Sequence, residues 1–220
     1  MRRIAKRNPP PRALTEAKGA GARRWDELHD GAKCTVREAL VEDQLGLCCY
    51  CMNRVESRAF DPGRVASGCK IEHLVPQSGD PSRVLDWTNL LAACGGGEGR
   101  PRKQQTCDTS KGDLRLQHVD PLGTLPELTY GTDGRIKGPT PEIQEELDEV
   151  LNLNTAQLKS NRKVVYGELL KRVRAELGRR KHWSDSGIRR WRDRLAAMQP
   201  APPYLGCLEY WLERLERRHS

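Results

Sequence analysis

Eight cysteines constrain this 220-residue chain more than any other feature of its sequence. No export signal is visible, because the basic start, MRRIAKRNPPPRAL, breaks at three prolines and does not continue into an apolar stretch. Cysteines in such a chain favour metal binding or packing over a disulfide framework. We therefore expect a cytoplasmic protein in which a metal ion holds part of the fold together.

Four of the cysteines have the spacing of a zinc site. Cys48 and Cys51 are separated by two residues, so one tight turn can direct both sulfurs at the same ion. Cys94 and Cys107 are separated by twelve residues, GGGEGRPRKQQT, whose glycines allow the loop to bulge out and bring its ends back together. The spacing predicts a structural Zn²⁺ bound by these four thiolates, with free buried or redox-active cysteines as the alternative.

The other four cysteines have less definite roles. Cys49 could compete with Cys48 for the ion, and Cys69 is close enough in the sequence to serve as a fallback ligand. Cys34 and Cys207 lie in helical or apolar surroundings, which favours packing as small hydrophobic side chains.

The chain is basic and polar. Its 38 Lys and Arg residues exceed its 30 Asp and Glu residues, the pI is near 9.2 and the mean hydropathy is −0.75. The first 24 residues contain eight basic residues and a single acidic one, Glu16. Such a surface favours a polyanion, because neutralised phosphates release counterions, although many basic proteins only solvate their charge. No apolar run approaches the roughly 18 residues of a membrane helix, so we expect no membrane segment.

Three segments differ in pattern. Residues 1–22 are rich in Pro, Gly and Ala, which predicts a basic, extended N-terminal arm. The pattern of residues 23–120, with short apolar runs and many glycines, predicts a helical lead-in followed by a loop-rich α+β unit. Residues 121–220 predict a hairpin followed by helices, because apolar residues recur there at spacings of three and four.

Local signals refine these segments. Thr35 is the predicted N-cap of the lead-in helix, and Gly46 is its predicted end. Asp133-Gly134 predicts the turn of a β-hairpin. Thr140, which precedes a proline, predicts the start of a further helix.

Residues 69–78, CKIEHLVPQS, place Glu72 beside His73 within an apolar, strand-like run. A phosphodiester is hydrolysed when an activated water attacks in line while a hard cation stabilises the developing charge. His73 has a suitable pKa to take a proton from water, and Glu72 and Asp108 offer the oxygen donors that Mg²⁺ or Mn²⁺ prefers. Because successive strand residues face opposite sides, we expect a bulge or turn to bring Glu72 and His73 into one site.

The motifs IEHLVPQ, DWTNLLAAC and CDTSKGD, interleaved with CCYC, resemble the HNH endonuclease family. The resemblance implies an α+β fold: a ββα-metal HNH nuclease core with a zinc knuckle, embedded in a mostly α-helical protein. It matches His73 to the general base and Glu72 to the acidic metal ligand. It matches Asn89 to the asparagine that ties down the loop of the base. Asp108 takes the third station, a metal ligand, where the family has His or Asn.

Further segments, including HVDPL, LNLNTAQLKSNR and APPYLGCLEYWLERL, are similar to the HNH-subunit family of the Septu antiphage system. This resemblance implies the nuclease effector subunit of a bacterial antiphage defence system. It also implies phage DNA as the substrate and an SMC- or ABC-like ATPase subunit as the partner.

Several alternatives stay open. The candidate contacts to a nucleic-acid backbone are Arg100, Arg102, Lys103 and Lys111, which otherwise only solvate a loop and a helix start. For His73 the alternative is a core histidine bonded to a backbone carbonyl. For the whole chain the alternatives are a non-catalytic zinc-knuckle adaptor or nucleic-acid-binding subunit, and an RNase with the HNH fold.

Overall fold

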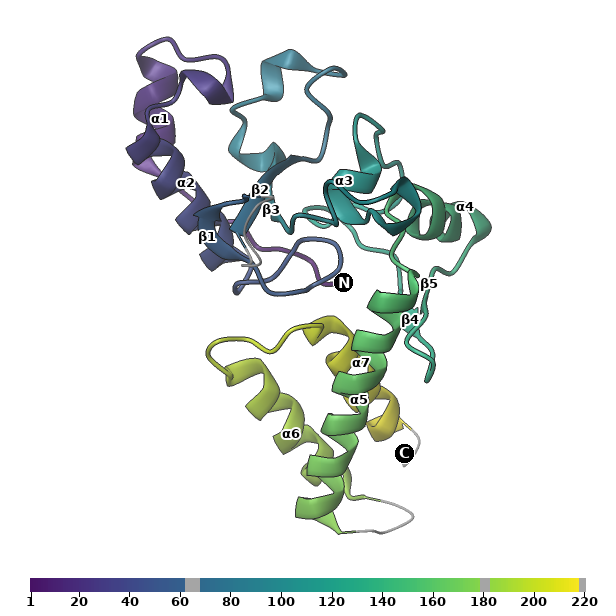
Figure 1. The fold of residues 1–220 in the computed structure, drawn as a ribbon. Helices are drawn as coiled ribbons and strands as arrows, with labels where there is room; N and C mark the ends of the chain where they lie inside the picture. Colours follow the sequence, from purple (N-terminus) through teal and green to yellow (C-terminus); the bar gives the residue numbers. More distant parts are fainter. Residues whose placement is uncertain (62–67, 179–182, 218–220) are drawn as a thin grey trace.

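The computed structural model describes residues 1–61, 68–178 and 183–217, and the fold is α+β, as predicted (Figure 1). The strands are β1 (Glu56–Ala59), β2 (Gly68–His73), β3 (Leu90–Ala93), β4 (Thr129–Tyr130) and β5 (Ile136–Lys137). The α-helices are α1 (Arg12–Gly19), α2 (Asp30–Asp43), α3 (Cys107–Lys111), α4 (Pro141–Glu145), α5 (Ala156–Leu177), α6 (Asp185–Ala197) and α7 (Leu205–Arg217). Short helical turns are η1 (Trp25–Glu27), η2 (Pro81–Arg83), η3 (Trp87–Asn89), η4 (Arg102–Gln104) and the π-helical η5 (Glu146–Val150).

A three-stranded sheet, in the order β1-β2-β3, carries Glu72 and His73 of the predicted site. β2 pairs antiparallel with β3, and this register sets His73 opposite Leu90 and Glu72 opposite Leu91. β1 pairs with the other edge of β2 in parallel, through an irregular register. Every residue of β3 is fully buried, because both faces of this strand are covered. The sheet therefore holds the end of β2 firmly in the interior.

Helix α2 begins earlier than predicted. Its N-cap is His29, whose Nδ1 accepts a hydrogen bond from Ala32 N at 3.1 Å, whereas Thr35 lies inside the helix. The buried face of the helix already starts at Ala32 and continues to Val36, so packing rather than the Thr35 motif sets the start. The predicted end is confirmed: Gly46, with a φ of 72°, follows the last turn.

The N-terminal arm predicted to be extended over residues 1–22 is partly helical and is packed against the rest of the protein. Helix α1 forms within it and buries Leu14, an apolar contact that outweighs the Pro/Gly-rich composition. Before α1, Ile4 is buried and its N–H donates to the carbonyl of Pro121 at 2.8 Å. The arm is therefore part of the core and not a free tether.

The signals after residue 121 are confirmed. β4 and β5 form the predicted hairpin, in which Gly134 adopts a φ of 84°. Thr140 caps α4, since its hydroxyl accepts a hydrogen bond from Ile143 N at 3.4 Å.

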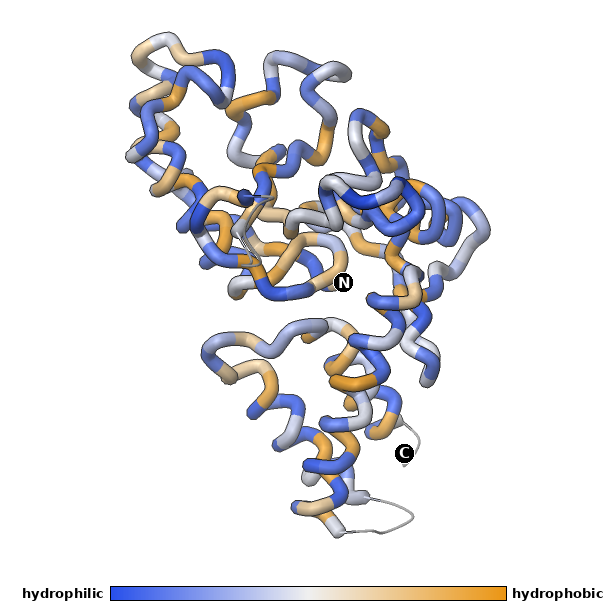
Figure 2. Tube along the Cα trace, viewed as in Figure 1, coloured by the Kyte–Doolittle hydropathy of each residue, from blue (hydrophilic) through white to orange (hydrophobic). Residues whose placement is uncertain are grey.

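Helices α5, α6 and α7 pack together at the end of the molecule away from β1–β3 (Figure 1). Polar and apolar residues alternate along them (Figure 2), and their buried faces form a second core from Leu169, Val173, Ile188, Trp191, Leu195, Leu208 and Leu212. The predicted apolar stripes are thus confirmed, except that Met198 is 37% exposed. No helix in the described ranges is both long and apolar enough to cross a membrane.

Candidate metal centre and active-site groove

Four cysteine sulfurs converge where the turn after α2, the end of β3 and the start of α3 meet. The Sγ atoms of Cys48, Cys51, Cys94 and Cys107 all lie within 4.8 Å of one another. Neighbouring sulfurs are 3.7 Å apart for Cys51 and Cys94, and 3.8 Å apart for Cys94 and Cys107. Four sulfurs at about 2.3 Å from one tetrahedral Zn²⁺ would be about 3.8 Å apart, so the predicted cluster fits this ion.

Local backbone geometry explains why distant cysteines meet. Met52, with a φ of 62°, closes the turn that follows Cys51, and Asn53 N donates to the Cys51 sulfur at 3.4 Å. Beyond Cys94, Gly96 has a φ of 54°. The residues that follow Gly96 leave the cluster, and the loop closes where Thr106 N donates to the Gly96 carbonyl at 2.7 Å. A Cβ at Gly96 would lie 2.2 Å from the Thr106 carbonyl oxygen, so this loop closure requires glycine.

The remaining cysteines lie outside this cluster. Cys49 is buried beside it, and burial raises the pKa of its thiol well above 9.0, which keeps the thiol neutral. Cys69 lies in β2, and Cys207 is buried in α7. Cys34 is exposed on α2, so its predicted packing role is wrong.

Glu72 and His73 do not share one face of β2. The register from Lys70 to His73 is continuous against β3, so successive side chains point to opposite sides. The predicted bulge at this point is therefore absent from the described pairing of β2 with β3. The two residues contribute to different parts of the site.

Glu72 belongs to a buried polar network. Its Oε1 accepts hydrogen bonds from Tyr50 Oη at 2.6 Å and from Lys111 Nζ at 2.9 Å. Lys70 Nζ lies 2.8 Å from Asp108 Oδ2, and the carboxyl groups of Glu72 and Asp108 are close enough to shift each other's pKa. The network thus joins both predicted metal-binding carboxylates to two lysines.

The two carboxyl groups hold their protons with different strength. Burial, followed by the hydrogen bond and the charge of Asp108, raises the pKa of Glu72 to about 8. Burial alone would raise the pKa of Asp108, but the hydrogen bond from Glu72 and the contact with Lys70 lower it. Glu72 therefore holds its proton more strongly than Asp108 does.

His73 is held as a neutral imidazole. Burial lowers its pKa below the ordinary value of 6.5. Its Nε2 lies 3.0 Å from the carbonyl oxygen of Val84, which can only accept, so Nε2 carries the proton and the lone pair is at Nδ1. The exposed Gln77 has its amide nitrogen 3.3 Å from Nδ1.

Asn89 ties together the two loops around His73. Its Oδ1 accepts a hydrogen bond from Val75 N at 2.7 Å. Its Nδ2 donates to the carbonyls of Val75 and Arg83, each at 3.1 Å. Asn89 is 1% exposed, so no water competes for these bonds. It thereby fixes the position of the neighbouring Val84 carbonyl, which in turn sets the tautomer of His73.

An open groove of 340 Å³ lies beside His73. Its described lining includes Trp25, Arg37, Phe60, Lys70, His73, Gln77 and Glu98. Lys70 lines the groove and also contacts Asp108, so the carboxylate network lies at the groove's edge. The groove is large enough for part of a substrate chain.

Three of the four predicted nucleic-acid contacts are accessible. Arg100, Arg102 and Lys103 are exposed on the loop between Cys94 and Cys107. Lys111 is not: it is 2% exposed, and its Nζ also donates to the His73 carbonyl at 3.1 Å. The predicted phosphate contact of Lys111 is therefore wrong, because the end of α3 on which it lies faces the interior.

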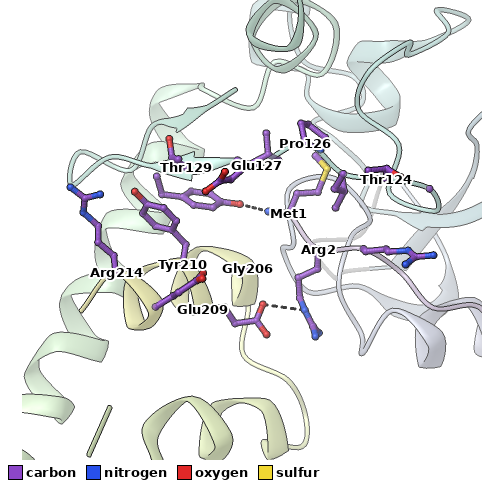
Figure 3. Close-up of a pocket in the computed structure, with 16 residues that line it drawn as sticks. Met1, Arg2, Thr124, Pro126, Glu127, Thr129, Gly206, Glu209, Tyr210 and Arg214 are labelled. Atoms are coloured by element: carbon purple, nitrogen blue, oxygen red, sulfur yellow. Dashed lines mark hydrogen bonds and ion pairs between the residues drawn. The ribbon is translucent and has the colours of Figure 1, made fainter. Parts of the chain in front are cut away.

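A larger cavity, of 670 Å³, lies elsewhere, between the first residues of the chain, the segment before β4 and α7 (Figure 3). In it the N-terminal amine of Met1 donates a hydrogen bond to the Tyr130 hydroxyl. Arg2 is paired with Glu209 at 3.1 Å (Figure 3). No predicted site residue is among the described residues that line this cavity.

Sequence reasoning missed three residues of the site. Tyr50 and Lys70 bond to the carboxylates, and Gln77 contacts the imidazole. Tyr50 stands between two zinc ligands and Lys70 stands two residues before Glu72, so their proximity was visible. Their partners depend on the pairing of β2 with β3 and on the position of α3, which the sequence pattern does not specify.

The chain matches no protein-family model, and no curated protein matches its sequence. Its function is therefore inferred from its motifs and from the groove, the cysteine cluster and the polar network around His73.

Proposed function

We propose that the chain is a metal-dependent endonuclease of the HNH type that hydrolyses DNA phosphodiester bonds. The observation that carries this proposal is the state of His73, a neutral imidazole with its lone pair at Nδ1, beside an open groove. Its bond to a backbone carbonyl also suits a structural histidine. A structural histidine, however, has no need of a groove lined by cationic and aromatic side chains.

In this proposal His73 is the general base. Nδ1 takes a proton from a water in the groove as that water attacks the phosphorus atom. Gln77 is exposed, so its amide can exchange its contact with Nδ1 for one with this water. Asn89 is a positioning residue, since it acts through the loop that presents the Val84 carbonyl.

Glu72 and Asp108 would hold the catalytic Mg²⁺ or Mn²⁺. Their carboxyl groups are close enough to shift each other's pKa, and once Glu72 loses its proton the pair would offer a hard cation several oxygen donors. When bound there, such a cation stabilises the charge on the phosphate and on the departing oxygen. The Lys70 side chain, between Asp108 and the groove, is placed to neutralise the charge of a nearby phosphate.

The order of elements supports the HNH assignment. β2 and β3 are antiparallel and are followed by α3. His73 ends β2, Asn89 immediately precedes β3, and Asp108 lies in the first turn of α3. The three predicted stations of the motif thus occur at the end of β2, just before β3 and in α3, in the order that the family resemblance implies.

Zinc at the four cysteines would have a structural role. The cluster links the turn at Cys48 and Cys51 to the end of β3 and to the start of α3. Cys107 immediately precedes Asp108, so the same ion would fix the position of this carboxylate.

The wider role in the proposal is that of a nuclease subunit in a bacterial antiphage defence system. It would cut phage DNA and work with an SMC- or ABC-like ATPase subunit. Support for this part comes from the sequence motifs, and the basic surface of the chain, with a net charge of +8, suits a nucleic acid.

Digestion of duplex DNA and structured RNA side by side tests the proposal. The zinc-loaded protein is incubated with each substrate in Mg²⁺, in Mn²⁺ and without added divalent cation, because a chelator would also remove zinc. We expect cleavage of DNA only when Mg²⁺ or Mn²⁺ is present. Cleavage confined to RNA would favour the RNase, and binding of DNA without cleavage, with or without the ATPase, would favour the adaptor.

A further inference from the structure

One wall of the groove beside His73 comes from outside the motif residues. It consists of Trp25 in η1 and Arg37 in α2, and Phe60 lies at the end of β1. The guanidinium carbon of Arg37 lies 5.6 Å from the centre of the Trp25 ring. This wall therefore presents a cation, supported by an aromatic ring, to the same space that the imidazole faces.

Arg37 lacks a partner for a buried donor. Its Nε is buried and has no hydrogen-bond acceptor among the residues that the structure describes. Among the described residues, the other buried side-chain donors without an acceptor are the indole nitrogens of Trp191 and Trp211. Tryptophan is uncharged, so Arg37 is the charged side chain among the three. An unsatisfied buried donor on a charged group is costly, and no described acceptor fixes the guanidinium of Arg37 at this nitrogen.

The described residues that line the groove offer Arg37 no free anion. Glu98 is the carboxylate in its described lining, and it lies 3.3 Å from Lys70 Nζ, which is also paired with Asp108. Cys69 also lines the groove, but burial raises the pKa of its thiol to about 11, so the thiol is neutral. The charge of Arg37 is thus left for a ligand.

We propose that Arg37 binds a backbone phosphate of the nucleic-acid strand in the groove, next to the phosphodiester that His73 faces. This inference rests on the proposed function, because it takes a phosphodiester chain as the ligand. A planar guanidinium pairs with two phosphate oxygens at once, and the cation–π contact with Trp25 helps to hold the Arg37 side chain beside the groove. Arg37 would therefore be a substrate-binding residue contributed by α2, outside the motif.

Binding of fluorescent DNA oligonucleotides, duplex and single-stranded, tests this inference without cleavage. Anisotropy is measured over a range of salt concentrations, without added Mg²⁺ or Mn²⁺, for wild type, Arg37→Gln and Arg37→Lys. The matched control is Arg172→Gln, which removes the same charge from an exposed position on α5. Melting curves and zinc content verify that each variant is folded.

We expect Arg37→Gln to weaken binding about tenfold. The slope of log affinity against log salt should fall by about 0.9 if the groove holds duplex DNA and by about 0.7 if it holds a single strand. Arg37→Lys should keep the slope and lose part of the affinity, because it keeps the charge but not the planar fork. Arg172→Gln should change neither quantity.

An unchanged affinity and slope in Arg37→Gln would overturn the inference, as would an equal loss in Arg172→Gln. If Arg37→Gln fails to fold, Arg37→Lys decides: a loss of affinity at wild-type melting temperature supports the contact, and wild-type affinity rejects it. The outcome is separable from that of the proposed function. Specific loss of binding in Arg37→Gln, with no cleavage by wild type, would keep the phosphate site and reject the nuclease.

Discussion

His73 can act as a base only while its imidazole is neutral. Burial lowers its pKa from the ordinary 6.5, and the Val84 carbonyl fixes the proton on Nε2. The groove and the exposed Gln77 lie on the side of the free lone pair. The environment of this one residue therefore determines both when and where it can accept a proton.

The dependence of cleavage on pH follows from this lowered pKa. Cleavage requires neutral His73, so activity is lost as the pH falls through the pKa of the folded protein. Because burial places that pKa below 6.5, we expect the acid limb of the rate profile to have its midpoint below pH 6.5. Single-turnover cleavage rates, measured from acid to neutral pH, give the midpoint of this acid limb. A midpoint above 6.5 would contradict a buried, neutral base.

The identity of the key residues was readable from the sequence, but their contacts were not. Asn89 was expected to secure the loop of the base, and its hydrogen bonds to Val75 and Arg83 are in place for that task. Lys111 was expected near a phosphate, but it is buried against Glu72. The sequence around Lys111 does not indicate that its side chain is buried, because the burial depends on which strand packs against the short helix α3.

At the scale of elements, the cysteine cluster holds together pieces that have little other regular structure. Cys48 and Cys51 lie in a turn, Cys94 directly follows β3, and Cys107 starts a helix of five residues. Such short elements bury too little surface to be stable alone. Metal binding is therefore expected to supply much of the folding free energy of this region.

Replacing Cys51 with Ser should remove bound zinc and lower the free energy of unfolding by several kcal/mol, on the order of half the roughly 10 kcal/mol that a structural zinc supplies. Zinc analysis and denaturant unfolding measure the two effects. Cys34→Ser is the matched control, because Cys34 is exposed and outside the cluster. Full zinc content and unchanged unfolding in Cys51→Ser would show that the four sulfurs do not form a metal site.

The boundaries of elements were predicted well where a turn residue sets them. Gly46 and Gly134 stand at turns with positive φ, and Thr140 caps its helix. The start of α2 was misplaced because Thr35 resembles a cap, whereas the buried apolar stripe begins at Ala32. Tertiary packing, and not the local motif at Thr35, determines where α2 begins, and the local sequence does not show this packing.

At the scale of the whole molecule, the N-terminal arm links distant parts of the fold. The Arg7 guanidinium bonds to Asp43 at 2.7 Å and to Glu42 at 2.8 Å, at the end of α2. Its backbone carbonyl accepts from Trp87 Nε1 at 3.1 Å, beside Asn89. The composition of the arm predicted an extended tether, because these partners lie far away along the chain.

Arg7→Gln should lower the free energy of unfolding by about 1–2 kcal/mol, since it removes charge-assisted bonds to a largely buried carboxylate. The matched control is Arg12→Gln. The Arg12 side chain is 90% exposed and pairs with Glu16 in its own helix, so its loss should cost about 0.5 kcal/mol or less. Chemical denaturation of both variants measures the difference. Equal effects would mean that the arm is not held by Arg7.

The most direct test of the account is cleavage of supercoiled plasmid by wild type, His73→Ala and His118→Ala in Mg²⁺ or Mn²⁺. His118 is a suitable control because its side chain is 47% exposed and contacts only Glu146 among the described residues. We predict that wild type and His118→Ala relax and linearise the plasmid. His73→Ala should be slower by about 100-fold or more, with unchanged zinc content and melting temperature. Cleavage by His73→Ala at the wild-type rate would contradict the assignment of the groove as the active site.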